Sequence, residues 1–525
     1  MRPAVLASAL LVVTPLLAHE AARERMRADL EFLCSPPLEG RASLTRGAEA
    51  AAWFLATELR KAGLQPGVGD GYLQRFDLVA LRLDPERSAV RVRHVGTESR
   101  FAPAAVFFPD PTREVELDLE VAFAGYGITA PELGYDDYAG VDVSGKAVLA
   151  FDHEPQEGDP ASVFHGTGFT LHANAWTKTR NAEQHGAAAL LLVTEPVNPH
   201  RSAPRAPDRA NAPPQALVRS ELGIPRVTLP PEAATALLQG TGRGPADWQT
   251  DIDRTLRPAS RVLPGVRVAI RAVNGDQAVQ PSWNVAGLLP GADPRLRDET
   301  ILVTSHYDHL GSQSGKLYPG ANDNASGVVA MLEVARRLMG RPLARGVLFV
   351  AFGSEEQLML GSYHYVAHPQ RPLATTRAVL NLDMVGRSEE HTPESAGAYE
   401  VTASQSDEMN LVGAAFSPDL AGLLRHAGAS AGMTFSDKFD RDSSSRALFR
   451  CDHLPFLQKG IPAVWIFGGF HPGYHEPTDT VDRLDFDKLD RVVRVTRGAV
   501  LALAGAGAPP RFAPVGRPSA AGDPP

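Results

Sequence analysis

Cysteine is nearly absent from this sequence: Cys34 and Cys451 are the two that occur among 525 residues. Two cysteines cannot build the disulfide framework that stabilises small secreted domains, so that class of protein is excluded. In an oxidising compartment the two could pair with each other, and as buried thiols they could stay free. The sequence leaves both arrangements open.

Long runs of like charge are also missing. Lys and Arg number 52 and Asp and Glu number 61, which gives a net charge of −9, and no run of five or six like charges occurs. This balance argues against the basic stripe of a nucleic-acid-binding protein and against a polybasic membrane patch. A complete Walker loop and a G-x-G-x-x-G element are absent too, which argues against nucleotide-dependent enzymes.

One long apolar run is present, from Ala4 to Ala18, between a single Arg and a charged segment. It is too short to span a bilayer comfortably and is typical of a secretory signal peptide over residues 1–18, with a buried N-terminal helix as the alternative. We therefore expect an exported protein, secreted or periplasmic, without a membrane span in the mature chain.

The length of the chain predicts two or three domains. Gly47–Gly63 has apolar residues at helical spacing and ends in glycine, which predicts a helix. Short strands separated by turns occupy about 110–270, and apolar strands alternate with helices from residue 282. The second pattern is typical of an α/β fold, with a mostly parallel central sheet flanked by helices.

We expect this domain to be interrupted by a β-rich insertion. The predicted segments are the signal peptide (1–18), the N-terminal part of the main domain (19–110), the insertion (111–271), the rest of the main domain (272–507) and a disordered tail (508–525). The tail has too few apolar residues to pack against the rest.

Acid and imidazole side chains follow the apolar strands. His306 and Asp308 follow one, Glu355 and Glu356 a second and Asp383 a third, while a loop with Tyr474 and His475 follows the fourth. Because ligands bind at the carboxyl ends of strands in open α/β sheets, these residues should converge in space.

Asp323 stands alone in "YPGANDNASG", where Asn and Ser alone would indicate an ordinary helix-capping loop. Together with His306, Glu356, Asp383 and His475 it gives two imidazoles and three carboxylates. This set fits two zinc ions, each with one His and one terminal carboxylate, joined by a bridging carboxylate. Asp323 is the candidate bridge, and the Glu next to a ligand Glu could act as a base.

The motifs that carry these residues resemble the M28 family of zinc peptidases, in their order and rough spacing from about residue 24 to 500. They read "SHYDHLG", "GANDNASG", "FGSEEQ", "NLDMVG", "RCDHLPFLQKGIPAV" and "YHEPTDT". Upstream, "FAGYGITAPELGYDDYAGVDVSGKAVLAFDHEP" is similar to the protease-associated (PA) domain that some family members contain.

The resemblance implies a role for each residue. His306 and Asp383 would hold one zinc, Glu356 and His475 the other, and Asp323 would bridge them. Glu355 would be the general base, Asp308 would hold His306, and Tyr474 would donate a hydrogen bond to the oxyanion of the intermediate. Leu358 and Cys451 depart from the family pattern, which bears on the shape of the substrate pocket.

The predicted function is that of an exported di-zinc exopeptidase that acts on peptides, an aminopeptidase in the first place. The alternatives are a carboxypeptidase of the glutamate carboxypeptidase type, a glutaminyl cyclase, which uses one zinc, and a non-catalytic receptor-like protein. The sequence does not predict the oligomeric state.

Overall fold

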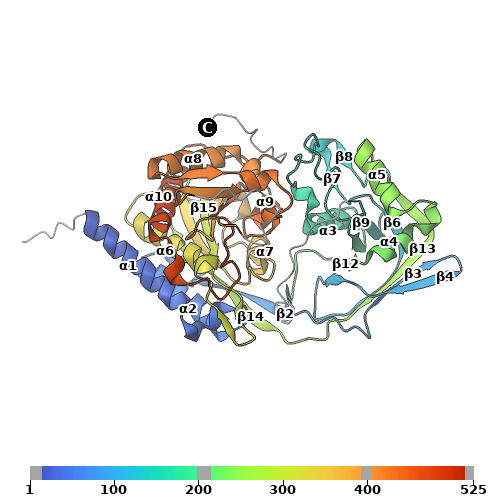
Figure 1. The fold of residues 1–525 in the computed structure, drawn as a ribbon, viewed down its shortest axis with the longest axis horizontal. Helices are drawn as coiled ribbons and strands as arrows, with labels where there is room; N and C mark the ends of the chain where they lie inside the picture. Colours follow the sequence, from blue (N-terminus) through green and yellow to red (C-terminus); the bar gives the residue numbers. More distant parts are fainter. Residues whose placement is uncertain (1–14, 198–213, 392–404, 506, 515–525) are drawn as a thin grey trace, which may run out of the picture.

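A computed structural model describes residues 15–197, 214–391, 405–505 and 507–514, which form two lobes (Figure 1). Most of the predicted signal peptide lies outside these residues, and helix α1 (Pro15–Leu33) begins near its C-terminal end. A search of the described helices for a membrane-spanning segment finds none of sufficient length and apolarity.

The larger lobe is built on a ten-stranded sheet. In order across the sheet its strands are β11 (Gln215–Leu217), β2 (Leu73–Ala80), β14 (Gln280–Leu289), β18 (Gly346–Phe352), β15 (Thr300–His306), β19 (Thr376–Asp383), β22 (Ala463–Phe467), β20 (Glu408–Val412) and β21 (Thr434–Ser436), and the short β1 (Gln65–Pro66) pairs with β14.

The α/β class predicted from the sequence is confirmed, and the sheet is mixed. Its four central strands, β18, β15, β19 and β22, are parallel to one another. The pairings on either side, β14 with β18 and β20 with β22, are antiparallel. Apolar runs identify buried strands, but the direction of an edge strand depends on how the chain returns to the sheet.

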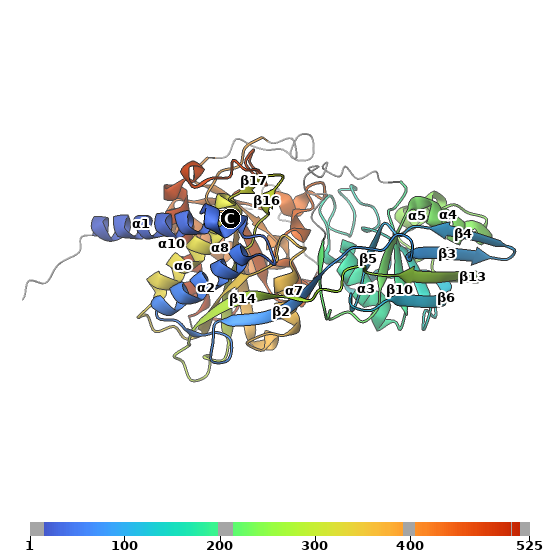
Figure 2. The same cartoon turned by 90° about the horizontal axis from the view of Figure 1, so that it is seen from below.

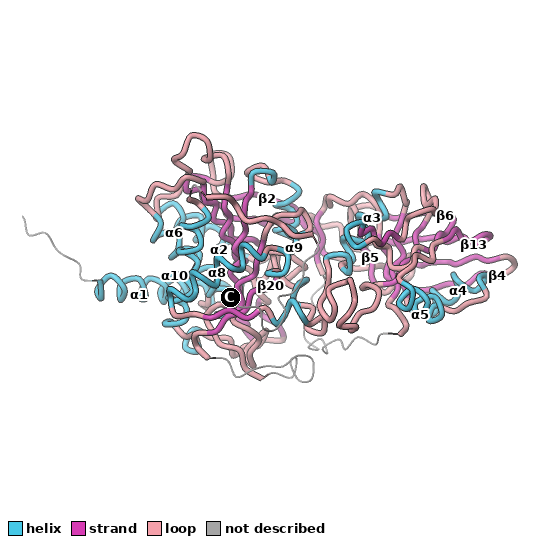
Figure 3. Tube along the Cα trace, turned by 90° about the horizontal axis from the view of Figure 1, so that it is seen from above, coloured by secondary structure: helices cyan, strands magenta, loops and turns pink. Residues whose placement is uncertain are grey.

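Helices cover both faces of this sheet, which explains why its central strands are apolar at nearly every position. Ile301 and Val303 of β15 point into one core and Leu302 into the other. The first core contains α1, α2 (Arg46–Lys61), α6 (Gly327–Leu338), α8 (Pro418–Ala431) and α10 (Phe486–Leu503), and the second contains α7 (Leu360–Ala367) and α9 (Leu454–Leu457). Figure 3 shows the helices on the two sides of the strands.

Helix α2 is the helix predicted over Gly47–Gly63. The side chain of Thr45 accepts a hydrogen bond from the backbone N–H of Ala48 at 3.3 Å and caps the first turn. Gly63 follows the last turn with φ of 90°, a conformation that favours glycine.

The smaller lobe contains an eight-stranded sheet. Its strands in order are β4 (Thr97–Phe101), β3 (Ala89–His94), β13 (Arg261–Ala272), β6 (Val115–Phe123), β9 (Ala147–Phe151), β10 (Ala189–Val193), β12 (Arg226–Leu229) and β5 (Ala105–Phe107). Helix α3 (Ala175–Gln184) packs on one face, and α4 (Pro231–Leu238) and α5 (Pro245–Thr255) pack on the other. A small hairpin, β7 (Thr129–Ala130) with β8 (Tyr135–Asp136), also belongs to this lobe, and a second, β16 (Gly311–Gln313) with β17 (Lys316–Tyr318), follows β15 in the larger lobe.

The smaller lobe takes in residues upstream of the expected insertion start at 111, because β3 pairs with β13 and β5 with β12. Within the expected insertion, β11 returns to the larger lobe and pairs with β2. The chain passes between the lobes along β2 and β14, which pair with each other (Figure 2). Partners this far apart in sequence leave no local signal.

A segment of the smaller lobe packs on the larger one. Phe169 and Ala173 belong to the core that contains α7 and α9, and the ring of Phe169 stacks on Phe449 with centroids 5.2 Å apart. The backbone N–H of Ser443 donates to the carbonyl of Thr167 at 2.8 Å. The smaller lobe therefore supports the loop that leads to Cys451.

Part of the tail that was expected to be disordered is packed. Phe512 stacks on Phe416, with ring centroids 6.2 Å apart, and the backbone N–H of Ala513 donates to the carbonyl of Phe416 at 2.8 Å. One aromatic ring supplies the apolar contact that the composition of the tail did not suggest. Residues 515–525 lie outside the described part of the chain.

Candidate metal centre

The four parallel strands carry acid and imidazole groups to the same edge of the sheet. His306 is the last residue of β15 and Asp383 the last of β19. Glu355 and Glu356 follow β18, and the loop after β22 carries His475. The convergence expected from the sequence is therefore present in the fold.

The first cluster consists of His306, Asp383 and Asp323. Nε2 of His306 lies 3.3 Å from Oδ1 of Asp383 and 3.5 Å from Oδ1 of Asp323. These residues are at most 5% exposed, and neither His306 Nε2 nor Asp383 Oδ1 has a hydrogen-bond partner. Buried polar atoms without partners that face one another fit a cation between them.

The second cluster contains His475, Glu356 and the other oxygen of Asp323. Nε2 of His475 lies 2.8 Å from Asp323 Oδ2 and 3.3 Å from Glu356 Oε1. The two oxygens of Asp323 thus face two different clusters, which is the arrangement that a bridging carboxylate needs.

The loop around Asp323 is held by buried polar groups. The carboxylate of Asp479 accepts hydrogen bonds from the backbone N–H groups of Asn322 and Asp323 at 2.9 and 3.0 Å. Arg41, which is 1% exposed, donates to the carbonyls of Gly320 and Tyr307, both at 2.9 Å. Sequence reasoning missed Arg41 and Asp479, because a single charged residue in a turn-rich motif looks like surface.

The side chain of Asn324 has a structural role in the same loop. Its amide donates to the carbonyl of Leu382 at 2.9 Å, and its oxygen accepts from the N–H of Gly327 at 2.9 Å. The first bond ties the loop to the end of β19, and the second joins it to the start of α6. A capping function is therefore present, alongside the convergence of Asp323 with both clusters.

Asp308 contacts His306 differently from what the sequence predicted. Nδ1 of His306 lies 3.2 Å from the backbone carbonyl of Asp308, whereas the nearest carboxylate oxygen is 3.9 Å away. That carboxylate accepts from the backbone N–H groups of Glu355 and Glu356 at 3.0 and 3.3 Å. A residue two positions after the His can accept a hydrogen bond through its backbone carbonyl as well as through its side chain. Here the carbonyl of Asp308 orients the imidazole of His306.

Glu355 lies beside the first cluster, with Oε2 3.9 Å from His306 Nε2. Burial, reinforced by the charges of Asp452, Glu356 and Asp383, raises the pKa of Glu355 well above its usual value against the opposing effect of His306. Burial and the charges of Glu356 and Asp383 raise the pKa of Asp323 in the same way. So many acids in one buried space call for positive charge in addition to the imidazoles.

Two further residues border the clusters. The half-buried ring of Tyr474 stacks on His475, with centroids 3.7 Å apart, so it lies at the second cluster. The thiol of Cys451 donates to Asp383 Oδ2 at 2.9 Å and orients that carboxylate. Cys34 and Cys451 are both free thiols, which settles the question that the sequence left open.

Residues 284–500 match the sequence profile of Peptidase family M28. The chain carries a peptidase family M28 domain. Both clusters, together with Glu355, Asp308 and Tyr474, fall inside the matched range. Arg41, which holds the loop of Asp323, lies outside it.

The M28 domain and its flanks are similar to known aminopeptidases. Aminopeptidase YwaD of Bacillus subtilis is 27% identical over 464 residues, which are 87% of this chain and 79% of that protein. Leucine aminopeptidase 2 of Arthroderma otae is 25% identical over 225 residues, 39% of this chain and 41% of that protein. The likeness to YwaD thus extends beyond the M28 domain.

Solved structures resemble the chain at lower identity. The aminopeptidase from Aneurinibacillus sp. strain AM-1 is 19% identical with a TM-score of 0.45 and covers 91% of this chain and 93% of its own. BSAP, a zinc aminopeptidase from Bacillus subtilis, is 21% identical with a TM-score of 0.44 and covers 93% and 96%.

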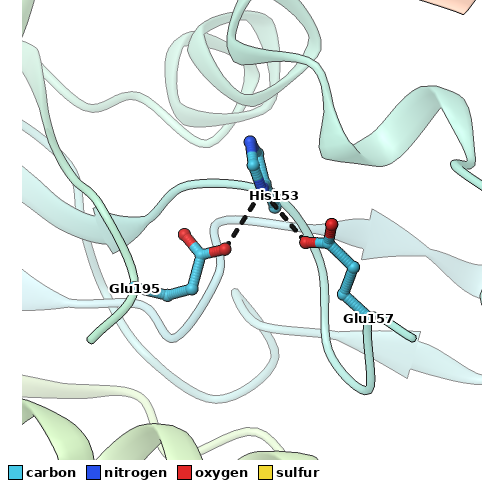
Figure 4. A group of neighbouring side chains, drawn as sticks. All are labelled: His153, Glu157 and Glu195. Carbon is cyan, nitrogen blue, oxygen red and sulfur yellow. Dashed lines mark hydrogen bonds and ion pairs between the residues drawn. The ribbon is translucent and has the colours of Figure 1, made fainter. Parts of the chain in front are cut away.

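A third cluster lies outside the M28 domain, in the smaller lobe (Figure 4). Nδ1 of His153 is 3.0 Å from a carboxylate oxygen of Glu157 and 3.0 Å from one of Glu195. Burial disfavours the charged imidazole, but hydrogen bonds to the two glutamates and the charge of Asp152 outweigh it and raise the pKa of His153 to about 9. At neutral pH this cluster is a buried imidazolium between two carboxylates.

Replacing His153 with Gln should therefore destabilise the protein in a pH-dependent way. The raised pKa contributes roughly 2 to 4 kcal/mol, all of it present below pH 6.5 and lost as the pH rises through 9. The thermal unfolding midpoint of H153Q should fall furthest below that of the wild type near pH 6, and the two should approach each other above pH 9.

His172 provides the control, because it forms a more exposed pair with Glu132 in the same lobe, with 2.7 Å between His172 Nε2 and Glu132 Oε1. H172Q should change the midpoint little at any pH. If the difference in unfolding midpoint between the wild type and H153Q grew with pH, His153 would be a neutral imidazole in the folded protein, not an imidazolium.

Proposed function

We propose that this protein is an exported aminopeptidase that uses two zinc ions. The observation that carries the proposal is that two buried clusters of imidazole and carboxylate share Asp323. Glu355 lies beside the first cluster but is not one of the residues that form either cluster. A peptidase needs such a separation between the groups that hold metal and the group that moves a proton.

His306 and Asp383 would hold one zinc, Glu356 and His475 the other, and Asp323 would contact both. Imidazole nitrogens and carboxylate oxygens are ordinary zinc ligands. When bound, zinc polarises the scissile carbonyl and lowers the pKa of water.

Glu355 is the candidate general base. Its backbone is held by Asp308 and its Oε2 lies 3.9 Å from His306 Nε2, so it borders the reaction space without occupying a ligand position. A cation nearby lowers the pKa that burial raises and keeps the carboxylate charged. Glu355 would then remove a proton from the attacking water and return it to the leaving amine.

Tyr474 is the candidate donor to the oxyanion. Its ring stacks on His475, so the phenol is anchored at one side of the second cluster. A hydrogen bond from this phenol would stabilise the charge that develops on the carbonyl oxygen during attack.

We infer that residues 1–18 direct export, to the periplasm or the medium, and that the smaller lobe is an inserted PA domain. The aminopeptidase activity rests on the names of relatives such as YwaD, which aligns over 79% of its own length.

Replacing Glu355 with Gln keeps the shape of the side chain and removes the base. Turnover of peptides should fall by about 10²- to 10⁴-fold, while the zinc content, measured by mass spectrometry of the metal, should equal that of the wild type. Glu390, which pairs with Arg387 and is 53% exposed, serves as the control: E390Q should retain activity. Activity of E355Q close to the wild-type level would exclude Glu355 as the base.

The direction of attack can be read from blocked substrates. An aminopeptidase requires a free α-amino group, so peptides with a free N-terminus should release their first residue and the same peptides with an N-acetyl group should remain intact. Products are separated and identified by mass. Release of C-terminal residues from acetylated peptides would show that the enzyme is a carboxypeptidase and not an aminopeptidase.

A further inference from the structure

A third imidazole, that of His309, faces the second cluster. Nδ1 of His309 lies 2.9 Å from Glu356 Oε1 and 3.9 Å from Asp323 Oδ2. Its ring centroid is 5.8 Å from that of His475. His309 belongs to the motif "SHYDHLG", but the roles predicted from this motif were assigned to His306 and Asp308, and none to His309.

Two imidazoles therefore share one pair of carboxylate oxygens: Nδ1 of His309 and Nε2 of His475 both lie near Oδ2 of Asp323 and Oε1 of Glu356. The four nitrogen–oxygen separations are 2.8, 2.9, 3.3 and 3.9 Å. Four donors placed tetrahedrally at about 2.0 to 2.1 Å from a zinc ion are about 3.3 Å apart. The nitrogen–oxygen separations lie close to this value, so one ion beside the two oxygens would be within reach of both imidazoles.

The ring of His309 is fully buried, and neither of its nitrogens has a hydrogen-bond partner. Although Nδ1 is close to Glu356 Oε1, the two atoms do not form a directed hydrogen bond. An imidazole that served only to orient Glu356 would point an N–H at that oxygen. The closeness of Nδ1 to one oxygen of each carboxylate is compatible with a metal ligand.

The surrounding backbone fixes the position of the ring. The N–H of His309 donates to the carbonyl of Arg41 at 3.1 Å. Gly320 has φ of 58°, and a Cβ added to it would lie 2.5 Å from ring atoms of His309. The loop of Asp323 thus closes directly on the imidazole and leaves it little freedom to turn away.

We propose that His309 is a fourth protein ligand of the zinc held by Asp323, Glu356 and His475. This inference rests on the proposed two-zinc centre and makes its two positions unequal. The second position has four protein ligands and is closed, as structural zinc sites are. The first has His306, Asp323 and Asp383, which leaves an open position beside Glu355 for water and substrate.

Zinc X-ray absorption and zinc affinity test the proposal on the full-length protein, stripped with a chelator and reloaded with two equivalents of zinc. The wild type should show scattering from three imidazoles over two ions. H309A should show scattering from two imidazoles. Its affinity for the more tightly bound zinc ion should also fall, by more than the about 10- to 100-fold that follows the loss of a residue that only hydrogen-bonds to a metal ligand. Affinity is measured by competition with a chromophoric chelator.

His453 is the matched control, because it is also fully buried with both nitrogens lacking hydrogen bonds, yet it forms no ion pair in the described part of the chain. H453A should keep the wild-type imidazole count and both zinc affinities.

Two imidazoles in the wild type would overturn the proposal, whether or not H309A folds. An unchanged count in H309A would overturn it too. Failure of the wild type to bind zinc would instead refute the two-zinc function on which the proposal rests, so the two failures are distinguishable.

Discussion

The structure depends on balancing buried negative charge at the carboxyl edge of one sheet. Glu355 and Asp383 lie within 4 Å of His306, Glu356 within 4 Å of His475, and Asp323 within 4 Å of both imidazoles. Burial and mutual repulsion raise the pKa of Asp323 and Glu355. The side chains around them supply hydrogen bonds and imidazoles, and cations among the carboxylates would favour their charged forms.

The rest of the larger lobe positions these groups. Four parallel strands bring the segments of His306, Glu356, Asp383 and His475 to the same edge. Arg41 and Asp479 hold the backbone of the loop that carries Asp323. Arg41 reaches this loop from the N-terminal segment, far outside the M28 domain. The smaller lobe contributes from a distance by packing on the loop that leads to Cys451, whose thiol orients Asp383.

The sequence predicted the α/β class and the convergence of the ligand segments because both follow from local patterns. A buried strand reads as an apolar run, and an acid at its end is unusual enough to be noticed. Lobe boundaries and edge-strand directions depend on pairings such as β3 with β13, which no local pattern reveals. His309 was missed for a related reason: beside His306 and Asp308, a third polar residue in one motif has no distinguishing mark until its ring is seen against Glu356.

The central claim is that Asp323 lies between two metal ions, and anomalous diffraction from crystals grown with zinc tests it most directly. Maps computed from data on the two sides of the zinc absorption edge should contain two peaks about 3.5 to 4 Å apart, one beside His306 and Asp383 and the other beside Glu356 and His475. A single peak, or two peaks that leave Asp323 bound to one ion, would contradict the account.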